Sequence, residues 1–305
     1  MAFMRSLEAR EVELDLDTDT DTAGQPKHRQ HRRHRLLPFS PWHLLLMPLA
    51  LIFALPLVQM VLTSFMTDAE INSFPPKFIP SSISFAGYQG FFGDSLAPRW
   101  LMNTCIVAAI SVGSHLVLCS LAGYGYARLK FRGRTFGFFA IVGTIMIPTQ
   151  LLMIPTYVMF SKLGIVDTLA AAFVPWLTSA FGIFLMRQFF LALPRELEEA
   201  GEIDGLTTFG VFRRIVLPLA KPALATLAVF TLLNSWNDLI WPLTAISNQD
   251  NFTIQVGLTT FQGTRRTQWS ELMAGNVVAT MPLIVGFLLA QRQFVATMTF
   301  SGLKG

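Results

Sequence analysis

The chain has 305 residues, of which 52% are hydrophobic and only 14% are charged, and its formal net charge is +4 at pH 7. Because soluble domains carry about 25% charged residues, this composition excludes a soluble globular enzyme, and it also excludes a disordered or fibrous protein. The basic residues lie between apolar runs, where membrane topology places them, so the positive charge does not indicate a nucleic-acid partner.

The N-terminal residues 1–35 consist of an acidic block over 8–21 and a basic block over 27–35. Such a segment cannot bury a core, so we expect a disordered cytoplasmic tail, followed by a membrane domain over 36–305. The basic block suits contact with anionic membrane lipid. The three histidines in it are regularly spaced, but the neighbouring cations would repel a metal ion, and we expect no metal there.

Six apolar runs are long enough to cross a membrane, which takes about 20 residues. They are residues 43–66, 102–126, 136–160, 168–190, 222–245 and 277–299. Lys and Arg gather before the first run, between the second and third, and between the fourth and fifth. This distribution predicts that both termini and the 191–221 loop face the cytoplasm. Prolines within the runs predict kinks. The predicted fold class is an all-α integral membrane protein with six transmembrane helices.

The sequence lacks the short motifs of a nucleotide-binding loop and of hydrolytic centres: G-x-x-x-x-G-K-[ST], H-E-x-x-H, G-x-S-x-G and C-x-x-C. Cys105 and Cys119 lie in one apolar run, about 21 Å apart along a helix, so they suit small buried side chains better than a disulfide or a metal pair. We therefore expect no catalytic residue, no metal site and no enzymatic activity.

The loop over residues 191–221 is the most informative stretch of the chain. Pro194 and the acidic residues that follow it suit the start of a short helix, and Gly205 suits its end. Thr208 can cap a second short helix that ends at Pro218. Small residues such as Gly201 would let another protein approach closely. The pattern predicts a cytoplasmic helix-turn-helix that contacts a partner.

Polar and aromatic side chains cluster in the outer half of the fifth predicted span: Asn234, Trp236, Asn237, Asp238 and Trp241. Asp238 is the only carboxylate well inside a predicted span, and such a group is a candidate for function by default. Tryptophan faces suit sugar rings, and carboxylates and amides suit hydroxyl groups, which favours a translocation path or gate. Alternatively, the tryptophans form an interfacial belt and Asp238 holds two helices together.

The 191–221 loop resembles the EAA signature of binding-protein-dependent ABC importer permeases, E-A-A-x-x-x-G followed by I-x-L-P. The matching residues are Glu199, Ala200, Gly201, Gly205, Ile215, Leu217 and Pro218, with Gly201 in place of the second Ala. Residues 184–190 and 236–243 are similar to the carbohydrate-uptake branch of that family. Residues 291–295 and 302–305 are similar to its maltose-type second permease.

This resemblance implies the type I ABC importer permease fold and transport of a sugar or sugar-like solute, such as an oligosaccharide, a disaccharide or a glycerophosphodiester. It implies a heterodimer with a second homologous permease in a bacterial cytoplasmic membrane. It also implies two copies of a cytoplasmic ATPase, which bind ATP and Mg, and an extracytoplasmic solute-binding protein. This chain itself would bind no cofactor.

The resemblance also implies residue roles. The coupling helix that lies in a groove of the ATPase would be built from Glu198, Glu199, Ala200, Gly201, Asp204, Gly205, Phe212, Ile215, Leu217 and Pro218. The C-terminal Gly302, Lys304 and Gly305 resemble a segment that reaches between the two ATPases. In maltose-type systems the sugar site resembles a feature of the other permease, so residues 234–241 suit a gate better than substrate ligands. The alternative is a stand-alone secondary carrier of small polar solutes, although such carriers usually keep several intramembrane charges.

Overall fold

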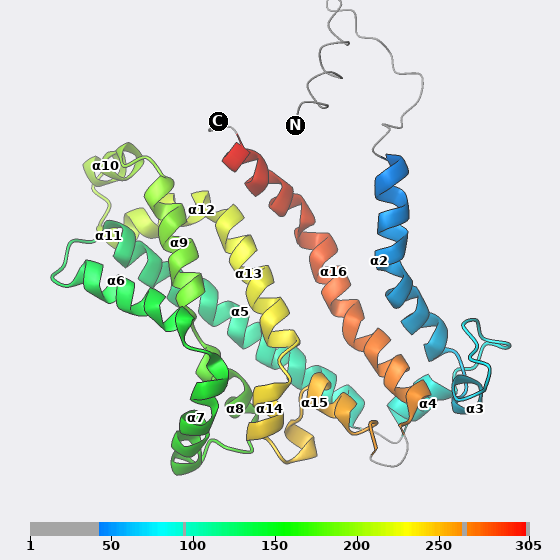
Figure 1. Cartoon of the computed structure of the whole chain (residues 1–305). Coiled ribbons are helices and arrows are strands. Elements are labelled where there is room, and N and C mark those ends of the chain that lie inside the picture. The colour runs from blue at the N-terminus through cyan, green and yellow to red at the C-terminus, as the bar shows by residue number, and fades with distance from the viewer. Residues whose placement is uncertain (1–42, 94–95, 264–266, 303–305) are drawn as a thin grey trace, which may run out of the picture. The chain divides into compact units, whose positions relative to one another are not determined.

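The computed structural model describes residues 43–93, 96–263 and 267–302, with side chains as far as Leu288. The N-terminal tail, with its histidines, lies outside the described residues, as do Lys304 and Gly305. Within the described part the chain is helical, and the only β-pairing is an isolated bridge between Gln262 and Thr267. The predicted all-α membrane fold is confirmed, and the helices are compatible with six spans (Figure 1).

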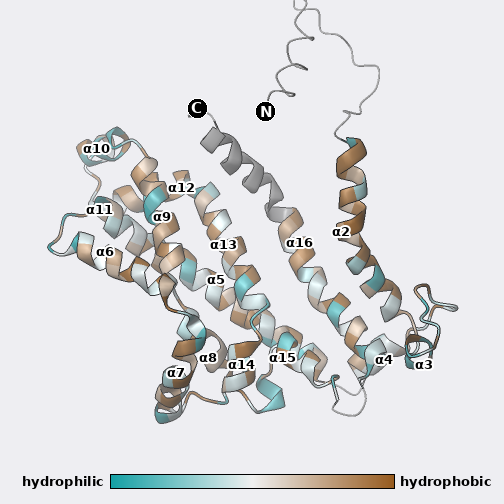
Figure 2. Ribbon diagram, in the orientation of Figure 1, coloured by the Kyte–Doolittle hydropathy of each residue, from teal (hydrophilic) through white to brown (hydrophobic). Residues whose placement is uncertain are grey.

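Three helices are long and apolar enough to cross a membrane without a break: α2 (His43–Ser64), α5 (Ala97–Arg128) and α16 (Trp269–Gly302). They correspond to the first, second and sixth predicted spans. Figure 2 shows hydrophobic residues along all three, whereas the short helix α10 (Glu196–Ile203) is largely hydrophilic. Shorter helices α3 (Asp68–Ile71), α4 (Ala86–Gly93) and α15 (Ile254–Thr259) lie in the connections between spans.

The other three predicted spans are each divided between helices. Residues 136–160 fall in α6 (Arg134–Gly143) and α7 (Thr149–Leu163), bent by 101°. Residues 168–190 fall in α8 (Leu169–Phe173) and α9 (Ala180–Ala192), bent by 42°. Residues 222–245 fall in α13 (Lys221–Trp236) and α14 (Ile240–Ala245). Pro148 and Pro175 lie at the first two breaks, where a missing N–H interrupts the helical hydrogen bonds.

Contacts at the two ends of α5 show which segments of the chain lie at the same end of this helix. At the end where α5 stops, Arg134 donates hydrogen bonds to the Leu129 and Ala127 carbonyls. Where α5 begins, the Trp100 indole donates to the Gln249 carbonyl, and nearby Asp167 accepts from the backbone of Ser247. Helix α5 has 32 residues and is therefore about 48 Å long. Arg134 begins α6 at one end of α5, and Asp167 follows α7 near the other end, so the bent pair α6–α7 runs from one side to the other.

Helix α5 packs closely against α9 and α13. A Cβ placed on Gly123 would lie 2.7 Å from Met186 Cβ and 2.9 Å from the Arg187 backbone nitrogen, so only glycine permits this approach of α5 to α9. A Cβ placed on Gly182 of α9 would similarly lie 2.7 Å from the Cys119 sulfur. The two buried apolar clusters lie at the two ends of α5, one around Trp100 and the other around Tyr124.

Candidate functional site

The predicted coupling loop folds as two short helices joined by a glycine turn. Helix α10 begins with three acidic residues, which favour the positive end of its dipole. It ends before Gly205, whose φ of +83° is a conformation that suits glycine. The second helix, α11 (Thr208–Val211), is capped by Thr207, whose hydroxyl accepts from the Gly210 N–H at 3.2 Å. The predicted cap at Thr208 was therefore wrong by one residue.

The chain then continues through a π-helical turn, Phe212–Val216, into α12 (Leu217–Leu219) before reaching α13. Phe212 is buried, with its ring 4.9 Å from that of Tyr124. Gly201 is also buried, and a Cβ there would overlap the Ile215 Cδ1 and lie 3.3 Å from Val211 Cγ2. Phe212 therefore packs the inner side of the loop onto the membrane helices, while Gly201 packs α10 against the rest of the loop.

The outer side of α10 is exposed and mixed in character. Glu199, Ala200, Asp204 and the strongly apolar Ile203, which is 86% exposed, lie on this side. Pro218 is exposed on α12, and Leu217 is half-buried against the Tyr124 cluster. This side of α10 is therefore open to solvent in the single chain, as contact with a partner would require.

Glu198 lies on the inner side of α10 and connects the loop to α5. Its Oε1 lies 2.5 Å from Arg128 Nε, and its Oε2 accepts from the Tyr124 hydroxyl at 3.1 Å. Arg128 also donates to the Leu193 carbonyl at 2.7 Å. The Arg128 and Glu198 side chains are only 8% and 13% exposed. We call these residues the Glu198 cluster: Tyr124, Arg128, Leu193 and Glu198.

The contribution of α5 to this cluster was missed in the sequence. Arg128 was noted only as one of several positive charges that orient the chain in the membrane, and Tyr124 only as part of an apolar run. No local pattern links them to Glu198, because 70 residues separate Arg128 from its partner. A signal in the sequence that could have indicated the pair is a glutamate on the inward face of α10 together with an arginine at the end of a preceding span.

A second site is a cavity of about 820 Å³ between α5, α9 and α13, with a mostly apolar lining and a group of polar side chains on one wall. Of the five predicted path residues, Asn234, Asn237 and Asp238 line it, together with His115. Trp176 also lines the cavity, and its buried indole N–H faces Asp238.

The polar wall of this cavity is rich in hydrogen-bond acceptors. The amide nitrogens of Asn234 and Asn237 donate to carbonyls of their own helix, at 2.9 and 2.8 Å, which leaves the amide oxygens for the cavity. Nδ1 of His115 lies 2.8 Å from the Ser111 carbonyl, which can only accept, so Nδ1 carries the proton. In the neutral ring Nε2 is then another acceptor.

The other two predicted path residues, Trp236 and Trp241, pack between helices and are not among the cavity-lining residues. Each is nearly fully buried. The Trp236 indole donates to the Ala279 carbonyl of α16 at 2.9 Å, and the Trp241 indole donates to the Ala171 carbonyl of α8 at 2.8 Å. In this structure these side chains connect helices.

The C-terminal segment contributes Gly302, the last residue of α16, while Lys304 and Gly305 lie outside the described residues. Across the described ranges no group of three or more His, Cys, Asp or Glu residues is arranged to hold a metal ion. Cys105 is exposed and Cys119 is buried, and both are free thiols.

The chain matches known proteins over most of its length. Residues 116–299 match the family model described as binding-protein-dependent transport system inner membrane component. The arabinooligosaccharides transport system permease protein AraQ of Halalkalibacterium halodurans is 35% identical over 260 residues, which are 84% of this chain and 93% of that protein. The sn-glycerol-3-phosphate transport system permease protein UgpE of Brucella abortus is 34% identical over 264 residues, 83% of this chain and 93% of that protein.

A similar fold is present in the crystal structure of a bacterial ABC transporter involved in the import of the acidic polysaccharide alginate. The match has a TM-score of 0.73 and covers 84% of this chain and 99% of that chain. Sequence identity is 23%, so this likeness shows the fold, that of an ABC importer permease.

Proposed function

Because this chain belongs to the family of inner membrane components of binding-protein-dependent transport systems, we propose that it is one permease subunit of an ATP-driven importer for a sugar or sugar-like solute. It forms half of the transmembrane pathway and itself performs no covalent chemistry. ATP and Mg bind to a separate cytoplasmic ATPase, of which two copies contact the permeases. An extracytoplasmic binding protein delivers the solute.

The observation that supports this function best is the Glu198 cluster. A surface helix transmits a partner's movement only if it is held firmly by the membrane helices. Helix α10 meets this requirement, since Glu198 contacts both Tyr124 and Arg128 of α5. The outer side of α10, with Glu199 and Ile203, is left for the ATPase groove. Closure of the ATPases would then move α10 and α5 together.

The solute class is supported by the cavity and by the names of relatives. Relatives are named for arabinooligosaccharides, trehalose, lactose and sn-glycerol-3-phosphate, all of which carry several hydroxyl groups. The amide oxygens of Asn234 and Asn237 and the carboxylate of Asp238 are acceptors that suit such hydroxyl donors. We assign these residues to the gate of the pathway.

The proposed orientation puts both termini and α10 in the cytoplasm. The basic residues Arg128, Lys130, Arg132 and Arg134 lie on the same side as α10, as the positive-inside rule requires. The opposite side carries the Asp167–Ser247 contact and would meet the binding protein. Surface left open on the membrane helices would be covered by the second permease and by lipid.

The first experiment is an affinity pull-down from native membranes, with the tag on the N-terminus. Mass spectrometry should find a Walker-motif ATPase and a second six-span permease in stable complex with this chain. Recovery of the chain alone, in a detergent that keeps a control ABC importer intact, would contradict the proposal and favour a secondary carrier.

Charge reversal at Glu199 tests the coupling role. Glu199→Lys should abolish ATP-driven uptake while the subunit stays inserted and retains the second permease, because Glu199 is exposed and only the ATPase contact changes. Uptake is measured in vesicles with ATP supplied inside. The matched control, Glu199→Asp, keeps the charge and should retain most of the uptake. Equal uptake by all three proteins would refute the coupling assignment.

A further inference from the structure

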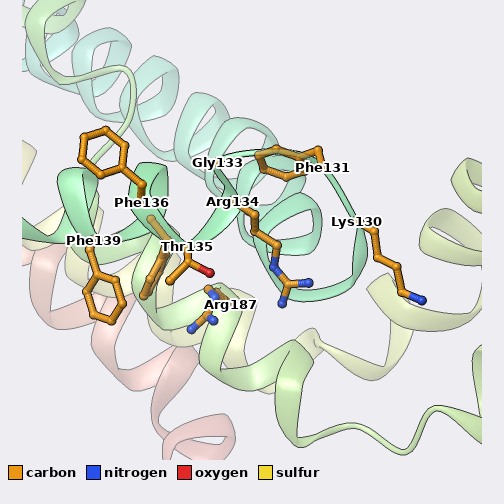
Figure 3. A pocket seen from close by; sticks show the side chains of 9 residues that line it. Lys130, Phe131, Gly133, Arg134, Thr135, Phe136, Phe139 and Arg187 are labelled. Atoms are coloured by element: carbon orange, nitrogen blue, oxygen red, sulfur yellow. The ribbon is translucent and has the colours of Figure 1, made fainter.

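A second cavity lies where the loop between α5 and α6 meets α9. Its volume is about 440 Å³, within the range of small-molecule sites. Figure 3 shows its lining, which comes from the loop, from the first turns of α6, and from one residue of α9. The lining residues are Lys130, Phe131, Gly133, Arg134, Thr135, Phe136, Phe138, Phe139 and Arg187. We call this cavity the basic pocket.

The basic pocket holds three cations and no carboxylate. The Arg134 and Arg187 charges are near enough to repel one another. Within the described part of the chain, none of Lys130, Arg134 and Arg187 is in an ion pair. Like charges held together without a counter-ion are unfavourable, so the pocket has a strong electrostatic preference for an anion.

Both guanidinium groups are held by hydrogen bonds: the terminal nitrogens of Arg134 donate to the Leu129 and Ala127 carbonyls, whereas Arg187 has more donors to spare. Arg187 Nε donates to the Tyr126 carbonyl at 3.2 Å, and its guanidinium carbon lies 3.9 Å from the centre of the Phe138 ring. Its two terminal amino groups donate to no described residue, although arginine has five N–H donors. Figure 3 shows the Thr135 hydroxyl pointing toward Arg134 and Arg187, so three donor groups converge.

The start of α6 adds to the positive potential. Helix α6 has no acidic residue in its first turn, and no side chain caps its N-terminus. The Arg134 N–H donates to the Phe131 carbonyl at 3.4 Å, but the positive end of the helix dipole still lies at Arg134 and Thr135, beside the three cations. A tetrahedral oxyanion such as a phosphate diester matches this arrangement of donors.

The pocket is also bordered by exposed apolar side chains. Phe136 and Phe139 of α6 are 80% and 65% exposed. They lie on a helix that forms half of a candidate membrane-crossing pair, where acyl chains can reach them. A soluble phosphate compound would have no contact with these rings, whereas a phospholipid has both a phosphate and an apolar tail.

We propose that the basic pocket binds the headgroup phosphate of an anionic phospholipid in the cytoplasmic leaflet, with the acyl chains lying along Phe136 and Phe139. The assignment to the cytoplasmic leaflet rests on the orientation given in the proposed function. The binding itself rests only on the geometry of the pocket. A basic pocket at a helix end, at the depth of the headgroups, is a setting in which such lipids are recognised.

The test measures lipid binding to the intact, delipidated transporter in a neutral detergent. Native mass spectrometry should detect bound phosphatidylglycerol, and phosphatidylcholine should bind much more weakly. Replacing two pocket cations, Lys130→Gln with Arg134→Gln, should weaken phosphatidylglycerol binding by about tenfold or more. Because Arg134 also holds the end of α5, Lys130→Gln alone serves as a second variant that leaves the fold unchanged and should weaken binding by a smaller factor.

The matched control is Arg132→Gln, in the same loop and also exposed but not in the pocket lining. It should leave phosphatidylglycerol binding unchanged. An equal loss in the control and in the pocket variants would overturn the proposal, since attraction would then depend on overall charge. Displacement of the lipid by inorganic phosphate alone would also overturn it, in favour of a soluble phosphate ligand.

These outcomes are separable from failure of the proposed function, because binding is measured without ATP or transport. An importer that transports a sugar but does not bind phosphatidylglycerol in this pocket would refute the lipid site alone. Labelling of a cysteine at position 132 from outside the cell would refute the orientation, and with it the leaflet, whatever the binding curve.

Discussion

Glu198 and Glu199 are adjacent in sequence and differ completely in their surroundings. Glu198 is paired with Arg128 and Tyr124, and only 13% of its side chain is exposed, whereas Glu199 is exposed on the outer side of α10. The sequence predicts that both acids favour the start of a helix, which is correct. It does not predict which one turns inward, because that depends on the face of α10 that packs against α5.

The polar residues of the fifth predicted span divide in the same way. Asn234, Asn237 and Asp238 line the 820 Å³ cavity, while Trp236 and Trp241 bond to carbonyls of neighbouring helices. From composition alone, all five suited either a pathway or a packing role. The face of each helix that packs against its neighbours decides between these roles, and no local pattern predicts how a helix is rotated about its axis.

Asp238→Asn should lower uptake at least several-fold while the ATPase remains bound. Asparagine keeps the size of the side chain but removes the charge from the cavity wall, which loses an acceptor for hydroxyl groups. The measurement is the initial rate of uptake together with the amount of ATPase that co-purifies. Unchanged uptake would reduce Asp238 to a packing residue.

The control for this variant is Trp236→Phe, which leaves the cavity wall intact. Loss of the indole hydrogen bond to Ala279 should destabilise the protein by about 1–3 kcal/mol. The melting temperature in detergent should therefore fall, while uptake per folded transporter stays the same.

At the scale of elements, the loop over residues 191–221 was predicted well and the membrane helices less well. Helices α10 and α11 and the turn at Gly205 follow from local signals: acids at a helix start, a threonine cap and a glycine with positive φ. The breaks in three spans were foreseen only as kinks. A proline marks where a helix is weakened, but the bend of 101° between α6 and α7 is set by packing elsewhere in the chain.

The Glu198 cluster predicts strong coupling between two elements. Arg128→Gln and Glu198→Gln should each destabilise the protein by about 3 kcal/mol, because each leaves a buried charge without its partner. The double variant should lose much less than the sum of the two. Thermal unfolding of all four proteins in detergent gives this double-mutant cycle, and additive losses would show that the two side chains act independently.

The tight packing inside the loop gives a compensating pair of substitutions. Gly201→Ala should destabilise the loop by about 1 kcal/mol or more, because the new methyl group overlaps the Ile215 Cδ1. Ile215→Val removes that carbon, so the double variant should be more stable than Gly201→Ala alone. Hydrogen exchange of residues 196–216 measures the effect, and a double variant less stable than both single variants would contradict this packing.

At the scale of the whole molecule, the described chain has two sides, one with α10 and the basic residues at the end of α5, and the other with the Asp167–Ser247 contact. The sequence predicted the division from the distribution of Lys and Arg, and the contacts at the two ends of α5 agree with it. The outlines of the two cavities could not be predicted, because each combines residues far apart in the sequence: the basic pocket joins residues 130–139 with Arg187, and the larger cavity joins residues of α5, α8, α9 and α13.

This arrangement predicts the accessibility of single cysteines in a Cys105→Ala background. A membrane-impermeant thiol reagent should label Asn248→Cys in intact cells and should label Arg132→Cys only in inverted vesicles. Both positions are exposed, so the difference reports sidedness rather than burial. Labelling of both from the same side would contradict the six-span arrangement.

The residues that line the cavity differ from the tryptophans that connect the helices, and this affects how such a subunit can change over evolution. The side-chain amides of Asn234 and Asn237 donate only within their own helix, so replacing them changes the cavity wall without disturbing contacts between helices. Trp236 and Trp241 hold the helices in place without lining the cavity. Under the proposed function, the gate can therefore be altered, by nature or in the laboratory, one wall residue at a time on an unchanged scaffold.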